Sequence, residues 1–488
     1  MSFSRAAGIL LHPTSLPGPN GIGELGPDAY RFLDVLADAG MTIWQVLPLG
    51  PTGYGDSPYQ CFSAFAGNPL LIHVPGAHGE FPPHSVDFAR VIPHKQALLR
   101  QATAQLMPDE SYRAFVAAQA AWLDDYALFM ALKQAHGGVA WTAWEQGAAR
   151  RDPRALEDWN TRLRDAVEHY RREQYLFFTQ YHALRKAAND RGIRIMGDLP
   201  IYVAHDSADV WANRGLFRLD DAGRPLVQAG VPPDYFSATG QLWGNPIYDW
   251  EELRARGYDW WIRRMRAALG LFDMVRIDHF RGFEAYWEVP GADVTAVNGR
   301  WVQGPGEALF NAMTHALGAM PIVAENLGVI TPAVEALRER FGYPGMGILQ
   351  FAFGGDGKAN DFQPHNYVRE LVVYTGTHDN DTTVGWWQSS GDGDSTRDAA
   401  AVEREKNFAR RYLATDGHEM HWTLMRTALA SVASTVLIPL QDVLGLGSEA
   451  RMNLPGRASG NWQFRFSWDQ LTPDLTRRVR DLVDLYER

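Results

Sequence analysis

The chain has 488 residues, of which 46% are hydrophobic and 21% are charged, as in globular proteins with a large core. Its net charge of −11 argues against a nucleic-acid partner. The single cysteine, Cys61, excludes a disulfide within the chain, and no apolar run approaches the roughly 20 residues that span a bilayer. The composition therefore predicts a cytoplasmic protein that is not embedded in a membrane.

The elements predicted along the chain alternate between buried strands and amphipathic helices. The first apolar run is broken by a histidine and a proline, so we interpret it as a strand and not as a signal peptide. Helical periodicity separates most strands; in residues 29–39, for example, Phe32, Leu33 and Leu36 form one stripe. The predicted strands are residues 8–15, 42–49, 193–203, 273–280, 321–327, 347–353, 371–377 and 434–440. Eight strands with intervening helices predict an α/β fold, a (β/α)8 TIM barrel, in place of an open sheet.

Residues 74–190 are too many for the connection of a single βα unit. Apolar residues recur there at helical spacing, as at Trp122 and Tyr126. We therefore predict a mainly α-helical insertion between the second and third strands. With an irregular active-site loop subdomain at residues 204–260, the chain would form one catalytic barrel over residues 1–488, with its insertions at the catalytic face.

Two loops that follow predicted strands carry residues suited to a sugar ligand. Residues 50–60, GPTGYGDSPYQ, combine the aromatic planes of Tyr54 and Tyr59 with acceptors such as Ser57. Taken alone, this segment is almost as consistent with a well-turned surface loop. Residues 228–250, QAGVPPDYFSATGQLWGNPIYDW, form a long aromatic stretch with many glycines and prolines. Such loops in compact proteins are usually functional.

The stretch LFDMVRIDHFRGFEAYWEVP, residues 271–290, begins as a buried strand and ends in charged residues. This pattern is typical of a parallel barrel, in which the carboxyl ends of the strands carry the catalytic groups. Arg276 and Asp278 share one face of the strand, because side chains alternate along it. The guanidinium would hold the carboxylate ionised and aimed into the cavity, as nucleophilic attack requires. The alternative is a structural ion pair at a strand end.

Further carboxyl groups follow other predicted strands. Glu325 comes after PIVA, His378 and Asp379 come after YTGT, and Asp198 lies at the end of the third strand. The carboxyl ends of all strands meet at one mouth of a barrel. One protonated and one ionised carboxyl group that flank a bond supply the acid and the nucleophile of a retaining glycosidase. A third carboxylate can stabilise the oxocarbenium-like transition state.

The motifs YGDSPYQ, GDLPIYV, VPPDYFSATGQLWGNPIYDW, VRIDHFRG, AENLG and TGTHDNDT together resemble the amylomaltases. These enzymes are 4-α-glucanotransferases, also called disproportionating enzymes, and are related to the α-amylase clan. The resemblance extends from HPTSLPG near the start to RMNLPG near the end. It implies that Asp278 is the nucleophile, Glu325 the general acid/base and Asp379 the transition-state stabiliser.

The resemblance also implies a substrate, α-1,4-glucans and maltooligosaccharides, with no cofactor and no metal. It implies that Arg276 contacts the substrate and supports the nucleophile, and that His378 and Asp198 bind the attacked sugar. Tyr59 and Ser57 would bind on the donor side, and Trp243 on the acceptor side. Asn245 would also contact the substrate, and Tyr54 would lie in a secondary glucan groove. Two positions depart from the family pattern. Asn326 stands where relatives usually have Asp, and Gly347 stands where they usually have Lys. Both departures change the charge near the catalytic trio.

Three other functions remain open at this point. A hydrolase of the α-amylase type would use the same trio, and a catalytically silent protein could bind glucans without turnover. A metal-dependent barrel hydrolase could use His378, Asp379 and Asp278 as ligands, although the sequence has no HxH pair at a strand end. The aromatic 228–250 loop favours a transferase, because it could exclude water and hold an acceptor sugar. The sequence does not set the oligomeric state.

Overall fold

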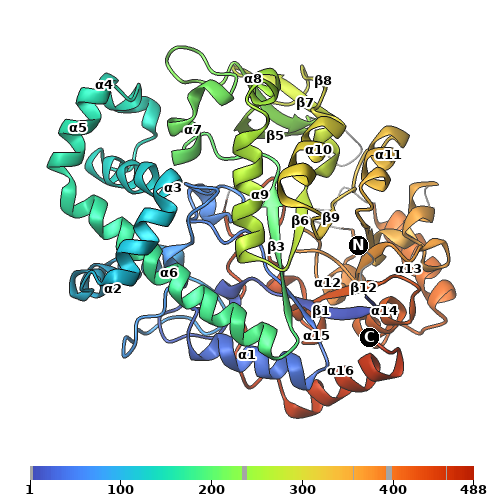
Figure 1. Cartoon of the computed structure of the whole chain (residues 1–488). Coiled ribbons are helices and arrows are strands. Elements are labelled where there is room, and N and C mark those ends of the chain that lie inside the picture. The colour runs from blue at the N-terminus through green and yellow to red at the C-terminus, as the bar shows by residue number, and fades with distance from the viewer. Residues whose placement is uncertain (1–3, 234–238, 355–356, 392–397, 458) are drawn as a thin grey trace.

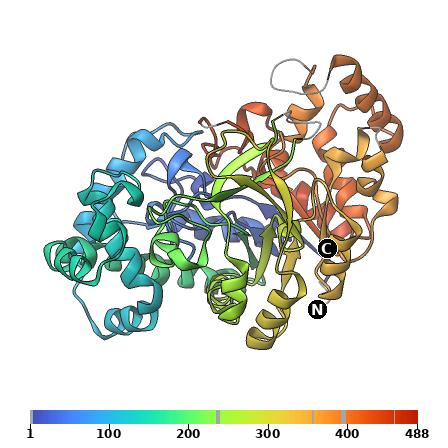
Figure 2. The same cartoon turned by 90° about the horizontal axis from the view of Figure 1, so that it is seen from above.

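The computed structural model describes residues 4–233, 239–354, 357–391, 398–457 and 459–488. Its main sheet has eight parallel strands in the order β10-β11-β12-β1-β2-β3-β6-β9. These strands are β1 (Ala6–Leu10), β2 (Ile43–Gln45), β3 (Arg194–Pro200), β6 (Met274–Asp278), β9 (Ile322–Ala324), β10 (Gly345–Ile348), β11 (Leu371–Tyr374) and β12 (Thr435–Pro439). The two outer strands approach each other through a hydrogen bond of 2.9 Å from Ala324 N to Pro344 O, which closes the sheet into a barrel (Figures 1 and 2). The predicted TIM-barrel fold is confirmed, and each predicted strand overlaps one of these eight.

The lumen of the barrel is filled by apolar side chains from its strands. They are Ala6, Ile43, Met196, Met274, Val323, Met346, Ile348, Val372, Tyr374 and Leu437. Side chains alternate along a strand, so residues two or four positions further on face the same lumen, at its carboxyl-end mouth. Counted from Met196, Met274 and Val323, those residues are Asp198, Arg276, Asp278 and Glu325. The alternation of the barrel strands therefore gathers the charged residues at one mouth.

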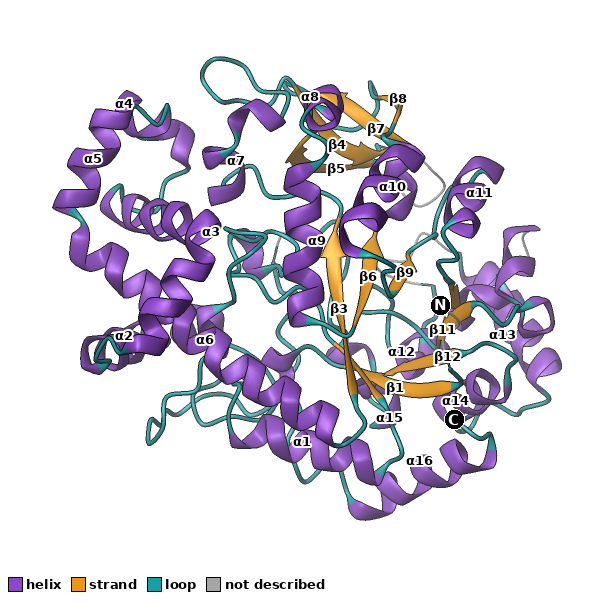
Figure 3. Cartoon of the chain, in the orientation of Figure 1, coloured by secondary structure: helices purple, strands orange, loops and turns teal. Residues whose placement is uncertain are grey.

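Helices surround the barrel and bury their apolar stripes against its outer face (Figure 3). The first of them, α1 (Pro27–Asp38), has a proline at its first turn and buries Phe32, Leu33 and Leu36, the stripe that the sequence predicts. The other helices outside the long insertion are α7 (Ala208–Ala212), α8 (Trp250–Ala255), α9 (Asp259–Leu271), α10 (Gly306–Leu317), α11 (Pro332–Arg340), α12 (Thr383–Gln388), α13 (Ala399–Leu413), α14 (Met420–Ala430), α15 (Leu440–Val443) and α16 (Pro473–Leu485). Within the described part of the chain, no helix is both long and apolar enough to cross a membrane.

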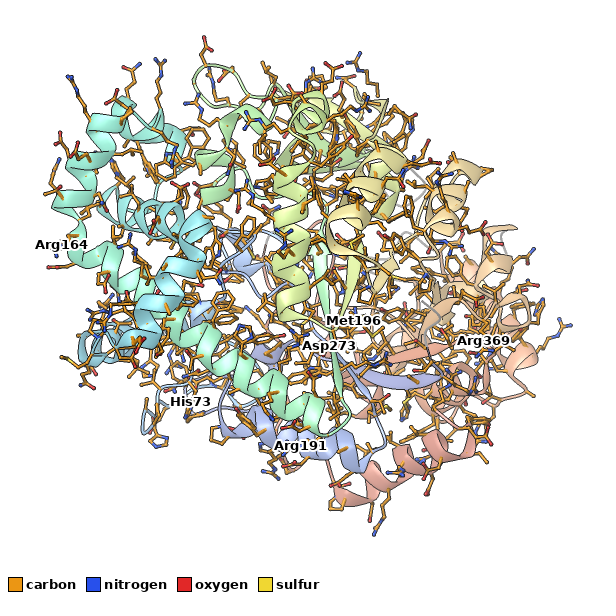
Figure 4. The ribbon with its side chains drawn as sticks, in the orientation of Figure 1. His73, Arg164, Arg191, Met196, Asp273 and Arg369 are labelled. Atoms are coloured by element: carbon orange, nitrogen blue, oxygen red, sulfur yellow. The ribbon has the colours of Figure 1, made fainter. Side chains whose placement is uncertain are left out.

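The insertion between β2 and β3 is built from helices, as predicted for residues 74–190, and lies at one side of the barrel (Figure 1). The helices are α2 (Phe88–Gln105), α3 (Glu110–Ala135), α4 (Gln146–Ala149), α5 (Pro153–Arg162) and α6 (Arg164–Asp190). Asp273, just before β6, attaches α6 to the barrel (Figure 4). Its carboxylate pairs with Arg185 of α6 at 2.7 Å and accepts a hydrogen bond of 2.8 Å from Ile195 N in β3. The grouping of residues 1–488 into one catalytic unit with two subdomains stays a prediction.

A second, antiparallel sheet lies beyond the barrel strand ends toward which the arrows of β3 and β6 point (Figure 3). Its order is β5-β4-β7-β8, and the strands are β4 (Val227–Val231), β5 (Gln241–Pro246), β7 (Ala285–Pro290) and β8 (Arg300–Gln303). The prediction of an irregular subdomain at residues 204–260 is therefore wrong for β4 and β5. The pairing of β4 shifts in register between Gln228 and Gly230, and β4 also pairs with β7, a strand far along the chain. Neither feature produces a local alternating pattern.

Candidate active site

Arg276 lies at the centre of the mouth and contacts two carboxylates. Its Nη1 donates to Asp198 Oδ2 at 2.6 Å, and its Nη2 lies 2.8 Å from Asp278 Oδ1. Burial alone would lower the pKa of Arg276, but the charges of Asp198 and Asp278 outweigh burial and raise this pKa well above its ordinary value. The predicted contact between Arg276 and Asp278 is confirmed. The guanidinium therefore fixes the directions of both carboxylates.

One carboxylate oxygen of Asp198 accepts no hydrogen bond from any described residue. Its side chain is 0% exposed, and Oδ2 accepts hydrogen bonds from Arg276 and, at 2.8 Å, from the hydroxyl of Tyr59. Among the described residues, none donates to Oδ1. Burial raises the pKa of Asp198. A buried acceptor without a donor costs free energy, so this atom is suited to receive a hydroxyl from a ligand.

Glu325 follows β9 and is 8% exposed. One of its carboxyl oxygens accepts a hydrogen bond of 2.7 Å from His279 N, and the other accepts one of 2.6 Å from Leu327 N. Burial, and then the charge of Asp278, raise the pKa of Glu325 to about 7. The backbone of His279 is left-handed, with φ of +55°. In this conformation its N–H points toward the carboxylate of Glu325. The residue after Asp278 thus connects the two strand ends that carry the two carboxyl groups.

His378 and Asp379, after β11, are held by the chain near its C-terminal end. His378 Nε2 lies 3.4 Å from Asp379 Oδ1, and the same oxygen accepts a hydrogen bond of 2.6 Å from Asn453 Nδ2. Asn453 N also donates to His378 O at 3.0 Å. The rings of Tyr59 and His378 stack, with centroids 5.2 Å apart and an interplanar angle of 18°. Asp379 is therefore connected to Asp198 through His378 and Tyr59.

The remaining residues assigned to the 50–60 loop have different surroundings. Ser57 Oγ accepts a hydrogen bond of 3.2 Å from Tyr59 N, which shapes the turn that presents Tyr59 to Asp198. Tyr54 is exposed, and its hydroxyl donates to Asp206 at 3.1 Å, close to Lys133 of the helical insertion. The structure therefore places Tyr54 beside the insertion, with Ser57 supporting Tyr59. Substrate contacts by both residues stay predictions.

Two further predicted residues lie on β5. The rings of Trp243 and His279 meet edge to face, with centroids 4.8 Å apart and an interplanar angle of 88°. Asn245 Nδ2 donates to Val203 O at 2.9 Å, and its Oδ1 accepts a hydrogen bond of 3.4 Å from Gln60. Both ends of the Asn245 amide thus bond to protein, while Trp243 lies beside the end of β6. Residues 234–238 of the same motif lie outside the described residues.

The two departures from the family pattern lie where β9 meets β10. Asn326 Oδ1 accepts a hydrogen bond of 2.8 Å from Met346 N, and its Nδ2 donates to Glu335 at 2.8 Å. Gly347 lies within β10, where a Cβ would be 3.0 Å from a methyl group of Leu371. The neutral amide of Asn326 therefore serves as donor and acceptor at once. It adds side-chain bonds where the barrel has little backbone pairing.

Sequence reasoning did not assign roles to three residues that contact the site. Asn453 and His279 lie within the motifs RMNLPG and VRIDHFRG, so a signal was present, but it did not indicate which contacts they make. Trp462 packs against both Tyr59 and His378, and no motif contained it. Within the described residues, no three His, Cys, Asp or Glu side chains are grouped as a metal site.

Comparisons with known proteins point to one family. A family model described as 4-alpha-glucanotransferase matches residues 11–472. A 4-alpha-glucanotransferase from Thermus thermophilus is 51% identical over 515 residues that cover 100% of both chains. One from Synechocystis sp. is 51% identical over 511 residues, covering 100% of this chain and 99% of its own. A solved structure of amylomaltase from Streptococcus agalactiae in complex with acarbose is 37% identical, covers 99% of each chain and superposes with a TM-score of 0.94.

Proposed function

The chain belongs to the 4-α-glucanotransferase family and is an enzyme that transfers α-1,4-glucan segments, and we propose that it does so with retention through a covalent glycosyl–Asp278 intermediate. The donor is an α-1,4-glucan or a maltooligosaccharide, and the acceptor is the 4-hydroxyl of glucose or of another maltooligosaccharide. In this mechanism Glu325 is the general acid/base and Asp379 stabilises the transition state. The amylomaltase bound to acarbose supports a carbohydrate ligand for this site.

In the first step a carboxylate oxygen of Asp278 attacks the anomeric carbon of the donor. The bond from that carbon to the glycosidic oxygen breaks, and Glu325 delivers its proton to the departing oxygen. Arg276 keeps Asp278 directed along the lumen, since it also holds the neighbouring strand through Asp198. A retaining pair requires carboxyl groups about 5–5.5 Å apart, and we expect this separation for Asp278 and Glu325.

In the second step the ionised Glu325 takes a proton from the acceptor hydroxyl, whose oxygen attacks the anomeric carbon and releases Asp278. Water would give hydrolysis by the same route, so an acceptor must be positioned to prevail. The ring of Trp243, beside His279, is the aromatic platform that we assign to the acceptor sugar. Transfer in place of hydrolysis is therefore attributed to the small sheet above the mouth.

One observation carries this proposal: two carboxyl groups at neighbouring strand ends have contrasting surroundings. Burial and the charge of Asp278 raise the pKa of Glu325 to about 7, where a group can give and take a proton at neutral pH. The Asp278 side chain is 30% exposed and ion-paired with Arg276. A second support is the unused acceptor of Asp198, which suits a hydroxyl of the attacked sugar.

The test is product analysis on maltotriose with wild type and Asp278→Asn. Wild type should form glucose together with longer maltooligosaccharides, and Asp278→Asn should lose this activity by several powers of ten, because an amide is a far poorer nucleophile. The matched control is Asp259→Asn, on the exposed start of α9, which should keep full activity. Glucose without longer products would favour a hydrolase. Normal transfer by folded Asp278→Asn would remove the proposed nucleophile.

The proposed chemistry uses only side chains of this chain. Independence from a metal or cofactor, and a cytoplasmic location, stay predictions. The binding roles of His378, Asp198, Tyr59, Ser57, Asn245 and Tyr54 are likewise part of the proposal. For Asp198, Tyr59 and His378, the mutual contacts support such a role, because these residues form one connected wall beside the Arg276–Asp278 pair.

A further inference from the structure

Trp462 has a backbone conformation that tryptophan seldom adopts. Its φ is +66°, in the left-handed region, where a side chain crowds the backbone and costs free energy. Trp462 is nevertheless buried, and its N donates to Met452 O at 2.7 Å. Strained residues of this kind persist only when the surrounding structure holds them, and they concentrate at functional sites. The strained backbone of Trp462 therefore indicates that the position of its indole matters to the structure around it.

The indole of Trp462 completes a group of three rings. Its centroid lies 5.8 Å from that of Tyr59, with an interplanar angle of 42°, and 6.0 Å from that of His378, with an angle of 36°. Tyr59 and His378 stack on each other, so each ring contacts the other two. A tilted indole against two stacked rings limits both their sliding and their tilting.

Each of the two rings that Trp462 contacts leads to a carboxylate of the site. The hydroxyl of Tyr59 donates to Asp198, which shares Arg276 with the proposed nucleophile. His378 Nε2 lies 3.4 Å from Asp379 Oδ1. A shift of the indole would therefore be transmitted to both sides of the position that the attacked sugar occupies.

The backbone around Trp462 is fixed relative to the same carboxylates. Two short segments, residues 451–454 and residues 461–462, form what we call the tail clamp. Within it, Asn461 Oδ1 accepts a hydrogen bond of 2.9 Å from Leu454 N, which ties the two segments together. Asn453 bonds to His378 O and to Asp379 Oδ1, which ties the clamp to the site.

We propose that Trp462 is a positioning residue for the subsite of the attacked sugar. Its indole holds the planes of Tyr59 and His378, while the tail clamp holds Asp379, so that both sides of the subsite keep one geometry during glycosyl transfer. Trp462 acts through these neighbours and takes no part in bond making or breaking. This inference rests on the proposed function, because it assumes that the sugar attacked by Asp278 lies against Tyr59 and His378.

The experiment compares Trp462→Leu, Trp462→Phe and a control, Trp422→Leu, on maltotriose. Trp422 is an equally buried tryptophan on the outer helix α14, where it packs against Arg478. Misplacement by a fraction of an ångström to 1 Å can cost up to about a hundredfold in rate. Trp462→Leu should therefore lower kcat about ten- to a hundredfold, and Trp462→Phe, which keeps a ring, about three- to tenfold. Trp422→Leu should leave kcat per folded molecule unchanged.

The rate per folded molecule, and not the ratio of hydrolysis to transfer, separates positioning from packing, because an indole that only fills space would lower the folded fraction and leave kcat of each folded molecule unchanged. Both products pass through the same glycosyl–Asp278 intermediate, so the Trp462 variants should lower them together and keep the ratio of wild type. Equal kcat per folded molecule in Trp462→Leu and Trp422→Leu would overturn the inference. If Trp462→Leu does not fold, an unchanged kcat in Trp462→Phe would also overturn it. Failure of the proposed function is distinct, because wild type itself would then form no transfer products or Asp278→Asn would remain active.

Discussion

Glu325 and Asp278 are two carboxylic acids whose surroundings in the barrel differ, in the way that the two proposed roles require. Glu325 is buried and accepts hydrogen bonds from two backbone N–H groups, whereas Asp278 is partly exposed and paired with a guanidinium. Two donated hydrogen bonds favour the ionised form of Glu325, but burial and the charge of Asp278 oppose it and prevail. The result is a pKa of about 7, which suits a group that must act as an acid and then as a base.

This pKa predicts a basic limb in the pH dependence of the enzyme. In the proposed mechanism only protonated Glu325 can protonate the leaving oxygen, so kcat/KM for maltotriose should fall about tenfold per pH unit above about 7. The measurement is kcat/KM from pH 5 to pH 9. The control substrate is maltotriosyl fluoride, since fluoride departs without a proton, and its initial release should lack the limb. The same limb with both substrates would mean that another group titrates.

At this scale the sequence predicts some contacts well and others not at all. The pairing of Arg276 with Asp278 follows from strand alternation within one segment. The contacts of Asn453 and Trp462 with the 378–379 region cannot be read from any local pattern, because the chain returns to the mouth only after α12, α13, α14, β12 and α15. The pKa of Glu325 also depends on burial, which is a property of the folded barrel.

At the scale of elements, we attribute the preference for transfer over hydrolysis to the small sheet. Trp243 lies on β5 and its ring meets that of His279, so it lies beside β6, the strand of the proposed nucleophile. Stacking of a ring on a sugar face is worth about 1–3 kcal/mol by analogy with other aromatic stacking, or roughly ten- to a hundredfold in partitioning. Trp243→Ala should therefore raise the hydrolysis-to-transfer ratio by up to that factor and leave glycosylation of Asp278 largely intact.

The measurement is free glucose and new reducing ends against transferred products on maltotriose. Trp301→Ala is the matched control, because Trp301 is a partly exposed tryptophan on β8 of the same sheet and its ring packs under Arg281. An equal loss of both reactions in Trp243→Ala would indicate that the residue only packs the sheet. An unchanged ratio would assign acceptor capture to other residues.

The junction of β9 and β10 is a second element on which the site depends. Asn326 directly follows Glu325, and its amide bonds to Met346 N and to Glu335 across the junction. Asn326→Ala would leave the buried Met346 N–H without this acceptor. We expect the free energy of unfolding in urea to fall by about 1–3 kcal/mol. Asn298→Ala, which removes an exposed hydrogen bond to Asp293, should change it by no more than about 0.5 kcal/mol. Equal losses in the two variants would remove the role proposed for Asn326.

Across the whole molecule, the barrel is predictable from sequence and the small sheet is not. Each barrel strand is buried on both faces and bounded by helices, so its apolar run appears within one short segment. The small sheet brings together β4 and β5 with β7 and β8, which follow β6 in the chain, and its pairing is irregular. Its strands depend on tertiary pairing, which local periodicity does not record.

The helical insertion is joined to the barrel by a buried charge cluster around Lys95 of α2. Lys95 is 0% exposed, and its ammonium contacts Glu24 and donates to Ile72 O at 2.5 Å. Glu24 also pairs with His73 at 2.9 Å and accepts a hydrogen bond of 3.0 Å from Asn20. Burial lowers the pKa of Lys95, and the charge of Glu24 opposes this shift. The ion pair is thus costly to bury and costly to break.

The last prediction follows from that balance. Lys95→Met would leave Glu24 buried with its closest cation removed, and removal of one partner of a buried pair costs about 3–5 kcal/mol of unfolding free energy. The double variant Glu24→Gln/Lys95→Met should lose less than the sum of the single variants, because no charge is then left unpaired. An unpaired buried carboxylate takes up a proton, so the loss in Lys95→Met should be smaller at pH 5 than at pH 8. Lys186→Met removes an exposed pair with Asp190 and should cost less than about 1 kcal/mol at both pH values. Urea unfolding of wild type, Lys95→Met, Glu24→Gln, the double variant and Lys186→Met measures these differences. A pH-independent loss in Lys95→Met equal to that in Lys186→Met would show that the cluster does not hold the insertion to the barrel.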